Sequence, residues 1–361
     1  MGMKCIRCGT DNNLRERTNN QGRCKNCSHL FAFEPAIMNE VKFTDGFFAK
    51  AINDISANET LYFTPKQLSY LLCKRINKKK APFSPGFPVI SGIFLLSLII
   101  AVIYDNKASL LTVVVFGGIV LVVLLPNELK FIKNRNELIL NKSSNFFLTQ
   151  EQFQDWINSW LRVNQIPKML PSNSEESAST PVSSDISTYS FDRAVICESA
   201  AIAQVLIANN FHFENNCAVL SITGYPQSIF GTVMLMLRRN PELKVYAIHD
   251  ASPSGVALVH HLRTSLDWFA NSNVTIYELG LLPRQIFSKP NLFVQTSQES
   301  AQQAKQLPEQ VRQSLSSDEL KWLEKGKFLE LESFSPQRII QILNQGIARS
   351  QDSTATVDSF G

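Results

Sequence analysis

Two long uncharged runs in the middle of the chain constrain its fold more than any other feature. Phe87–Tyr104 and Leu110–Leu125 hold 18 and 16 residues without a charge, and residues 105–109 separate them. At about 1.5 Å per helical residue, the first run reaches roughly 27 Å, close to the thickness of a bilayer's hydrocarbon core. The runs predict a transmembrane hairpin within residues 83–127. Because the second run is rich in β-branched residues, buried strands of a soluble domain are the alternative.

Basic residues flank this hairpin on both sides, and the short loop carries one Lys and one Asp. The positive-inside rule therefore predicts a multi-pass membrane protein with two spans and both termini in the cytoplasm. No ionisable residue lies within either run, so the hairpin is expected to anchor the chain in the lipid bilayer and not to form a transport pathway. The flanking residues are Lys74, Arg75, Lys78, Lys79 and Lys80 before the hairpin, and Lys130, Lys133 and Arg135 after it.

Charge is distributed unevenly along the chain. Residues 1–80 carry 14 Lys and Arg against 7 Asp and Glu, whereas residues 193–345 carry 13 of each. A basic first quarter indicates contact with phosphate, either of nucleic acid or of anionic lipid, and a solvated basic surface is the alternative. The 7 cysteines are unevenly spread, which is unlike a secreted disulfide framework and favours a reducing location.

Four cysteines near the N-terminus predict a zinc ribbon over residues 1–33. Two CxxC pairs, Cys5 with Cys8 and Cys24 with Cys27, are separated by 15 residues. Four thiolates at this spacing complete a closed tetrahedral Zn²⁺ site, which is structural because no position stays open for substrate. Gly9 and Gly22 suit the turns beside such cysteines. A redox dithiol is the alternative interpretation.

Helices are expected on both sides of the hairpin, in residues 34–82 and 128–168. Two lie within residues 43–76, and the second starts at Thr64-Pro65. A third opens with a Thr149–Gln152 capping box. Residues 169–191 and 348–361 are polar and are expected to be a disordered linker and tail.

Residues 192–347 alternate strand and helix patterns, which predicts a doubly wound parallel sheet. The whole chain is therefore expected to be a multidomain α/β plus α protein. Ligands gather at the carboxyl ends of such strands, where Glu198 and Asp250 are expected to face one another. Two carboxylates can hold Mg²⁺ and assist phosphoryl chemistry, or they can cap the following helices. The expected strands are Ala194–Cys197, Ala218–Thr223, Val245–His249 and Val274–Tyr277, and the expected helices are Ser199–Asn209, Gln227–Arg239 and Gly255–Phe269.

Three ordered motifs in this region resemble a known family. Glu198 after a strand, the turn Gly224-Tyr225-Pro226, and Asp250-Ala251-Ser252-Pro253-Ser254-Gly255 are similar to the Toprim domain found in the A subunit of topoisomerase VI and in its meiotic double-strand-break relatives. The stretch 322–334 resembles the C-terminal part of that family. The resemblance implies a nucleophilic tyrosine on a winged-helix-like domain, for which Tyr70 is the counterpart; a packed helix residue is the alternative. It also implies DNA as a partner and is compatible with a homodimer.

One departure from the family bears on the chemistry. Ser252 stands where the family has a second Asp, so a Mg²⁺ site of Glu198, Asp250 and Ser252 has lost one negative charge.

Two functions follow as hypotheses. The first is a membrane-anchored DNA-binding or tethering module with a partly degenerate Toprim-like domain. The alternative is a Mg²⁺-dependent transesterase or nuclease, topoisomerase VI A-like or a defence nuclease, with Glu198 as acid/base, Asp250 as metal ligand and Tyr70 as nucleophile. A protein partner stays unidentified.

Overall fold

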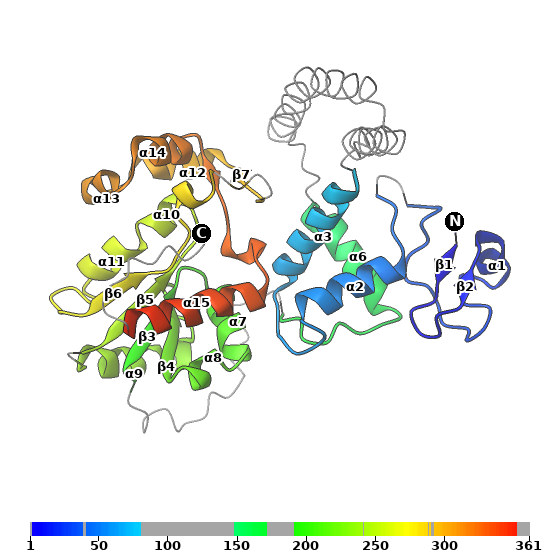
Figure 1. The fold of residues 1–361 in the computed structure, drawn as a ribbon, viewed down its shortest axis with the longest axis horizontal. Coiled ribbons are helices and arrows are strands. Elements are labelled where there is room, and N and C mark those ends of the chain that lie inside the picture. Colours follow the sequence, from blue (N-terminus) through cyan, green and yellow to red (C-terminus); the bar gives the residue numbers. More distant parts are fainter. Residues whose placement is uncertain are drawn as a thin grey trace, which may run out of the picture. The chain divides into compact units, whose positions relative to one another are not determined.

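The computed structural model describes residues 2–38, 41–80, 148–171, 191–240, 242–287, 289 and 292–351 (Figure 1). The chain divides into two compact units, one formed by Met1–Leu72 with Leu148–Gly361 and the other by Cys73–Phe147. The predicted hairpin at 83–127 lies outside the described residues, as do positions 172–190 of the predicted linker and 352–361 of the predicted tail. No helix within the described part of the chain is both long and apolar enough to cross a bilayer.

The N-terminal segment forms a small ribbon. Strands β1 (Met3–Lys4) and β2 (Asp11–Asn12) pair antiparallel, and helix α1 (Leu14–Asn19) follows. The start of α1 is closed by a reciprocal capping box between Asn13 and Glu16.

Three helices follow the expected pattern. They are α2 (Asp45–Ile55), α3 (Pro65–Lys80) and α6 (Gln150–Leu161). The predicted capping box between Thr149 and Gln152 is confirmed at the start of α6. Helix α3 begins in the same way, because Thr64 Oγ1 accepts from the Gln67 amide and Gln67 Oε1 accepts from the Thr64 amide.

Asp45, at the start of α2, ties the ribbon to the helices. Its buried carboxylate accepts hydrogen bonds from the backbone amides of Ala32 and Phe33, at 2.9 and 3.0 Å. The Phe33 ring then packs against Phe48 of α2 and Trp160 of α6, with ring centroids 5.1 and 6.2 Å apart. The end of the ribbon is therefore part of the core of the helical segment.

Residues 191–351 form the predicted α/β domain. Four parallel strands stand in the order β4-β3-β5-β6, which confirms the parallel sheet. Strands β3, β4 and β5 are almost wholly buried, whereas β6 at the edge of the sheet is only partly buried. Helices cover both faces: α9 and α11 pack on the face of Ile196 and Ala247, and α15 reaches the opposite face, where Ser350 contacts Tyr246. The strands are β3 (Arg193–Cys197), β4 (Cys217–Ser221), β5 (Lys244–Ile248) and β6 (Thr275–Glu278), and the helices are α7 (Ala200–Ala208), α8 (Phe211–Glu214), α9 (Gln227–Arg238), α10 (Pro253–Val256), α11 (Leu258–Thr264) and α15 (Pro336–Gln351).

One predicted helix is wrong in its extent. The helix expected over Gly255–Phe269 is divided into α10 and α11, and α11 ends at Thr264. The chain then turns back, since the Phe269 amide bonds the Leu262 carbonyl and Arg238 of α9 binds the carbonyl of Trp268 at 3.1 Å. Trp268 and Phe269, beyond Thr264, are in the core of the domain, which is why their pattern resembled a longer helix.

The last part of the α/β domain returns to the edge of the sheet where the strands end. Strands β7 (Gln295–Thr296) and β8 (Lys327–Phe328) pair antiparallel, and Leu329 then forms an isolated bridge with Ala251. This bridge brings residues 329–332 beside Asp250. The other elements here are the 3₁₀ turns η2 (Pro283–Gln285) and η3 (Leu331–Ser333) and the helices α12 (Gln298–Lys305), α13 (Glu309–Ser314) and α14 (Ser317–Glu324).

Candidate functional site

Glu198 and Asp250 meet at the carboxyl ends of two neighbouring strands. Glu198 follows β3 and Asp250 comes two residues after the end of β5, and β3 pairs directly with β5. The Asp250 amide donates a 2.8 Å hydrogen bond to Glu198 Oε2. The sequence predicted that these two residues face one another, and the structure brings them into contact.

The loop after Asp250 surrounds the Glu198 carboxylate with hydroxyl groups. Ser252 Oγ and Ser254 Oγ donate to Glu198 Oε1 at 3.2 and 2.6 Å. Ser252 Oγ also accepts from the Gly255 amide at 2.9 Å, as the N-cap of α10. The hydroxyl that replaces the family's second carboxylate therefore stabilises the loop and orients Glu198.

Asp250 is partly buried, and other carboxylates lie near it. Its Oδ1 accepts from the Leu331 amide at 2.7 Å. Burial raises the pKa of Asp250 well above its usual value, and the negative charges of Glu198, Glu330 and Glu332 raise it further. A divalent cation would offset this charge, and Mg²⁺ is commonly held by one or two carboxylates, water and substrate phosphates. Glu198 and Asp250 are thus suited to hold it.

Tyr70 of α3 reaches the same carboxylates, although it lies far away in the sequence. Its hydroxyl donates a hydrogen bond to Glu330 Oε2, and the Gln295 side-chain amide donates to the hydroxyl oxygen at 2.5 Å. The residue is 8% exposed. Burial raises the pKa of the Tyr70 phenol, and so do the charges of Glu330, Glu332 and Asp250. Tyr70 is therefore a neutral phenol at the edge of an acidic cluster, which we define as Asp250, Glu330 and Glu332.

The first turn of α3 is held against this acidic cluster by polar contacts. Lys66 Nζ lies 2.7 Å from Glu330 Oε1 and 3.8 Å from Glu332 Oε2, and Thr64 Oγ1 donates to Glu332 Oε1 at 2.7 Å. Burial lowers the pKa of Lys66, but the charge and hydrogen bond of Glu330 outweigh it, so the net shift is upward. For the carboxyl of Glu332, burial raises the pKa, and the positive charge of Lys66 lowers it by less, so the net shift is upward.

A second contact, away from the carboxylates, joins the residues before α3 to the α/β domain. The Tyr62 amide donates to Asn209 Oδ1 at 2.8 Å, and Asn209 Nδ2 donates to the Tyr62 carbonyl at 2.9 Å. Because α3 is held at both places, the position of Tyr70 is determined by tertiary contacts and not by its own helix.

His249, which directly precedes Asp250, contacts both Asp250 and Glu278. Its side chain is fully buried, Nδ1 lies 2.8 Å from the Asp250 carbonyl oxygen, and Nε2 lies 3.2 Å from Glu278 Oε1. Burial lowers the pKa of His249, but these two acceptors raise it more, so the net shift is upward. Since both ring nitrogens face acceptors, the contacts are those of an imidazolium donating twice.

The sequence predicted part of this site and missed the rest. Glu198, Asp250 and Ser252 come together, and Tyr70 joins them through the acidic cluster. Glu330 and Glu332 were not assigned, although they belong to a stretch that resembles the family's C-terminal part. Gln295 carries no sequence signal, because only the fold brings β7 to this edge, and the contact of Lys66 with Glu330 likewise depends on the fold.

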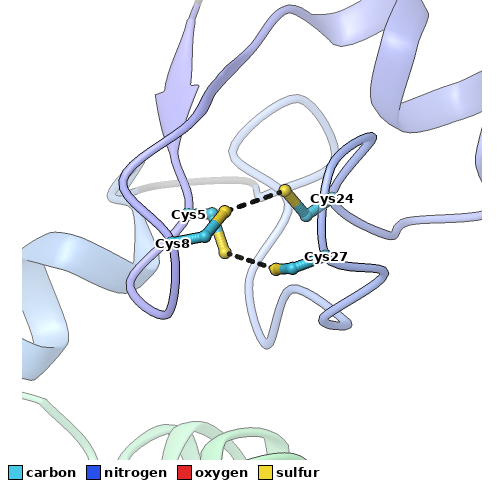
Figure 2. Close-up of side chains that lie close together, drawn as sticks. All are labelled: Cys5, Cys8, Cys24 and Cys27. Carbon is cyan, nitrogen blue, oxygen red and sulfur yellow. Dashed lines mark hydrogen bonds between the residues drawn. The ribbon is translucent and has the colours of Figure 1, made fainter.

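The four cysteines form the second candidate site (Figure 2). Their sulfur atoms all lie within 4.8 Å of one another. In the described part of the chain, no other group of three or more His, Cys, Asp or Glu side chains converges in this way. Cys5 Sγ is 3.6 Å from Cys27 Sγ, and Cys8 Sγ is 3.6 Å from Cys24 Sγ. Four sulfurs converging at this separation are a donor set that fits Zn²⁺.

The two CxxC turns have the same backbone geometry. In each turn, the backbone carbonyl of the first cysteine accepts from the backbone amide four residues later, at 2.9 Å for Gly9 and 3.0 Å for Ser28. The backbone amide of the same cysteine donates to the carbonyl five residues later. That fourth residue has a positive φ in both turns, +74° at Gly9 and +55° at Ser28. The turn assignment of Gly9 is therefore confirmed. Gly22, with φ +76°, serves a different turn, where its amide bonds the Arg17 carbonyl at the end of α1.

Neighbouring side chains hold this cysteine site in place. Asn12 Nδ2 lies 3.6 Å from Cys24 Sγ, and Asn12 Oδ1 accepts from the Lys25 amide at 2.8 Å. Arg17 makes a bidentate pair with Glu34, at 2.8 and 3.0 Å, and donates to the Asn12 carbonyl. A buried amide donor beside a sulfur is typical of the outer shell that tunes a thiolate metal site.

Comparison with known proteins identifies the α/β domain. Residues 194–345 match the family model for the Toprim domain of Spo11 and of the topoisomerase 6 A subunit. This part of the chain, 152 of its 361 residues, is similar to that Toprim domain. The match includes Glu198, Asp250 and Glu330, whereas Tyr70 and the cysteines of the ribbon lie outside it. No curated protein matched the chain.

Proposed function

We propose that this chain cleaves and rejoins DNA phosphodiester bonds through a covalent intermediate on Tyr70. The observation that carries the proposal is the hydrogen bond from Tyr70 to Glu330, which joins residues 260 positions apart and places a candidate nucleophile at the acidic cluster of a Toprim domain. Transesterification needs a nucleophile within reach of groups that accept its proton and stabilise the charge on phosphate. Tyr70 and the Toprim carboxylates can supply these parts.

Mg²⁺ is the expected cofactor, held by Glu198 and Asp250. When bound, it supplies positive charge for the phosphate oxygens of the substrate. The protein's own part is to orient the two carboxylates: Ser252 and Ser254 hold Glu198, and the Leu331 amide holds Asp250. His249 fixes the backbone of Asp250 through its carbonyl oxygen.

DNA is the expected partner, and the first part of the chain is suited to hold it. Residues 1–80 have twice as many basic as acidic residues, 14 against 7, and include the ribbon. Because basic side chains release counterions when they neutralise phosphates, such binding weakens as salt rises. Zn²⁺ in the four-cysteine site would hold the ribbon in the shape that presents these side chains.

A second candidate function, DNA binding without cleavage, is favoured by one observation. Both oxygens of Glu198 already accept hydrogen bonds, from the Asp250 amide and from the two serine hydroxyls. A carboxylate satisfied in this way has less need of a metal ion, and the loop then acts as a stable binding surface.

One experiment separates the two functions. The full chain is incubated with supercoiled DNA and Mg²⁺, and protein covalently attached to DNA is trapped by denaturation with SDS. We expect an adduct that Tyr70→Phe and Asp250→Asn abolish. Tyr62→Phe is the matched control, since Tyr62 packs its ring against Lys168 and bonds Asn209 only through its backbone. Salt-sensitive DNA binding without any adduct would refute the transesterase and support the binding function.

We further propose that the chain is attached to a membrane by a hairpin within residues 83–127, with both termini in the cytoplasm. The support is the pair of uncharged runs between basic flanks. Carbonate-washed membranes from expressing cells are expected to retain the full chain and to release a variant lacking residues 83–127. Recovery of the full chain in the soluble fraction would refute the anchor.

A further inference from the structure

We propose that Glu330 is the catalytic residue that accepts the proton of the Tyr70 hydroxyl, that Lys66 positions Glu330, and that Gln295 stabilises the developing phenolate. This inference rests on the proposed function and names the residues that activate its nucleophile. It transfers the acid/base role that the sequence suggested for Glu198 to another carboxylate.

The contacts of Glu330 are those of a base that is oriented by a third group. One carboxylate oxygen, Oε2, accepts from Tyr70, and the other, Oε1, lies 2.7 Å from Lys66 Nζ. The Glu330 side chain is 18% exposed and Lys66 is 49% exposed, so the carboxylate is largely shielded while the ammonium group stays in contact with water. A nucleophile bonded to a base that is itself held by a charged partner is the arrangement by which enzymes activate hydroxyl groups.

The other carboxylates are already engaged elsewhere. Glu198 accepts from the Asp250 amide, Ser252 and Ser254, and Asp250 Oδ1 accepts from the Leu331 amide. Glu332 Oε1 accepts from Thr64. Because a phenol has one proton to donate and Tyr70 directs it to Glu330, the path of that proton is already present.

The charge of the site also favours transfer to Glu330. Ionising Tyr70 by losing its proton to water would add a negative charge to the acidic cluster, which the raised pKa of the phenol reflects. Transfer to the bonded carboxylate leaves the net charge of the pair unchanged. Lys66 and the Gln295 amide, which bonds the phenol oxygen at 2.5 Å, stabilise the two products of the transfer.

In the proposed step, Tyr70 Oη forms a bond to the phosphorus of the scissile phosphodiester while its proton passes to Glu330 Oε2. The bond from phosphorus to the leaving deoxyribose oxygen breaks, and that oxygen takes a proton from water. In rejoining, the deoxyribose hydroxyl returns its proton to the hydroxide left from the first step, and its oxygen forms a bond to the phosphorus. The bond from phosphorus to Tyr70 Oη breaks, and Oη takes back the proton held by Glu330.

The test measures single-turnover formation of the covalent adduct together with DNA affinity, both on the full chain. Glu330→Gln keeps a hydrogen-bond acceptor for Tyr70 but removes the base, so we expect the adduct rate to fall about 10²–10⁴-fold while DNA affinity stays within about twofold. Glu309→Gln, the same change at an exposed carboxylate on α13, is the control and is expected to leave the rate unchanged. Lys66→Met is expected to slow the step, and Lys66→Arg to restore most of it.

A second measurement separates a base from a merely structural residue. Replacing Tyr70 with a fluorinated tyrosine, whose phenol ionises more readily, reduces the need for a base, so the defect of Glu330→Gln is expected to shrink. A Glu330→Gln chain as fast as wild type, or a defect of equal size with the fluorinated tyrosine, would overturn the role of Glu330 and leave the transesterase in place. Absence of any Tyr70-dependent adduct in the wild-type chain would overturn both proposals.

Discussion

Gly255 offers the most direct test of the close packing around the two strand-end carboxylates. A Cβ at this position would overlap the carbonyl oxygen of Asp250 and stand 2.8 Å from Glu198 Oε2. The first of these neighbours is backbone, which cannot swing away, so Gly255→Ala must displace the loop that joins β5 to α10. The clash falls on the hydrogen bonds that orient Glu198, so it affects the site and the stability together.

The expected cost is at the upper end of what over-packing produces, about 3 kcal/mol. For a domain of this size, 1 kcal/mol shifts the melting temperature by roughly 2–4 °C, so we expect a decrease of about 6–12 °C. The matched control is Gly231→Ala in helix α9, where a Cβ meets nothing within 4 Å. That change is expected to stabilise the helix by about 0.5–1 kcal/mol, since alanine has the higher helix propensity.

Thermal and urea unfolding of the three chains, followed by circular dichroism, measures both effects. The reasoning would be refuted if Gly255→Ala were within about 0.5 kcal/mol of wild type, a difference typical of surface substitutions. It would also be refuted if Gly231→Ala were as destabilising as Gly255→Ala, because the cost would then follow from losing a glycine and not from the close approach.

Three further predictions concern the ribbon and the charges of the site. Mass spectrometry of metals is expected to find one Zn²⁺ per chain in the purified protein. Removing the metal with a chelator, or changing Cys24→Ser, is expected to abolish the protection of backbone amides from hydrogen exchange in residues 2–33. Protection that persists without metal would contradict a metal-dependent fold. Asp45→Ala leaves the buried amide of Phe33 and the partly buried amide of Ala32 without their acceptor. Denaturant titration should show a loss of about 2 kcal/mol, since an orphaned buried donor costs about 1–3 kcal/mol. The raised pKa of Asp250 means that the folded state binds the proton of this carboxyl more tightly than the unfolded state does. The stability that comes from this tighter binding is fully present below the unfolded-state pKa of about 3.9, and it is lost as pH rises through the folded-state pKa. Asp250→Asn is therefore expected to be more stable than wild type near pH 7 while losing activity, and a Tm below that of wild type at this pH would contradict the charge argument.

Local patterns predicted the elements around the site well. The buried strands β3, β4 and β5 of the α/β domain are mostly apolar runs because both faces of the sheet are covered there, and such runs are visible without a structure. The capping box at Thr149 and the start of α3 at Thr64 were also predicted, because caps depend on residues only three positions apart. The helix after Asp250 was predicted too long, since Trp268 and Phe269 are apolar for packing in the core and not for helix formation.

By itself, the sequence determined the group of four cysteines, the uncharged runs at 83–127, the motifs that resemble a Toprim domain and the identity of Glu198 and Asp250 as strand-end carboxylates. Each of these depends on spacing along the chain or on the fixed rule that parallel strands end at one edge of a sheet. Only the tertiary structure decided what surrounds Tyr70. Its contacts with Glu330 and Gln295 join residues more than 200 positions apart, and those with Lys66 pass through the same carboxylate. No local periodicity specifies such contacts, because they depend on how α3 packs against the α/β domain.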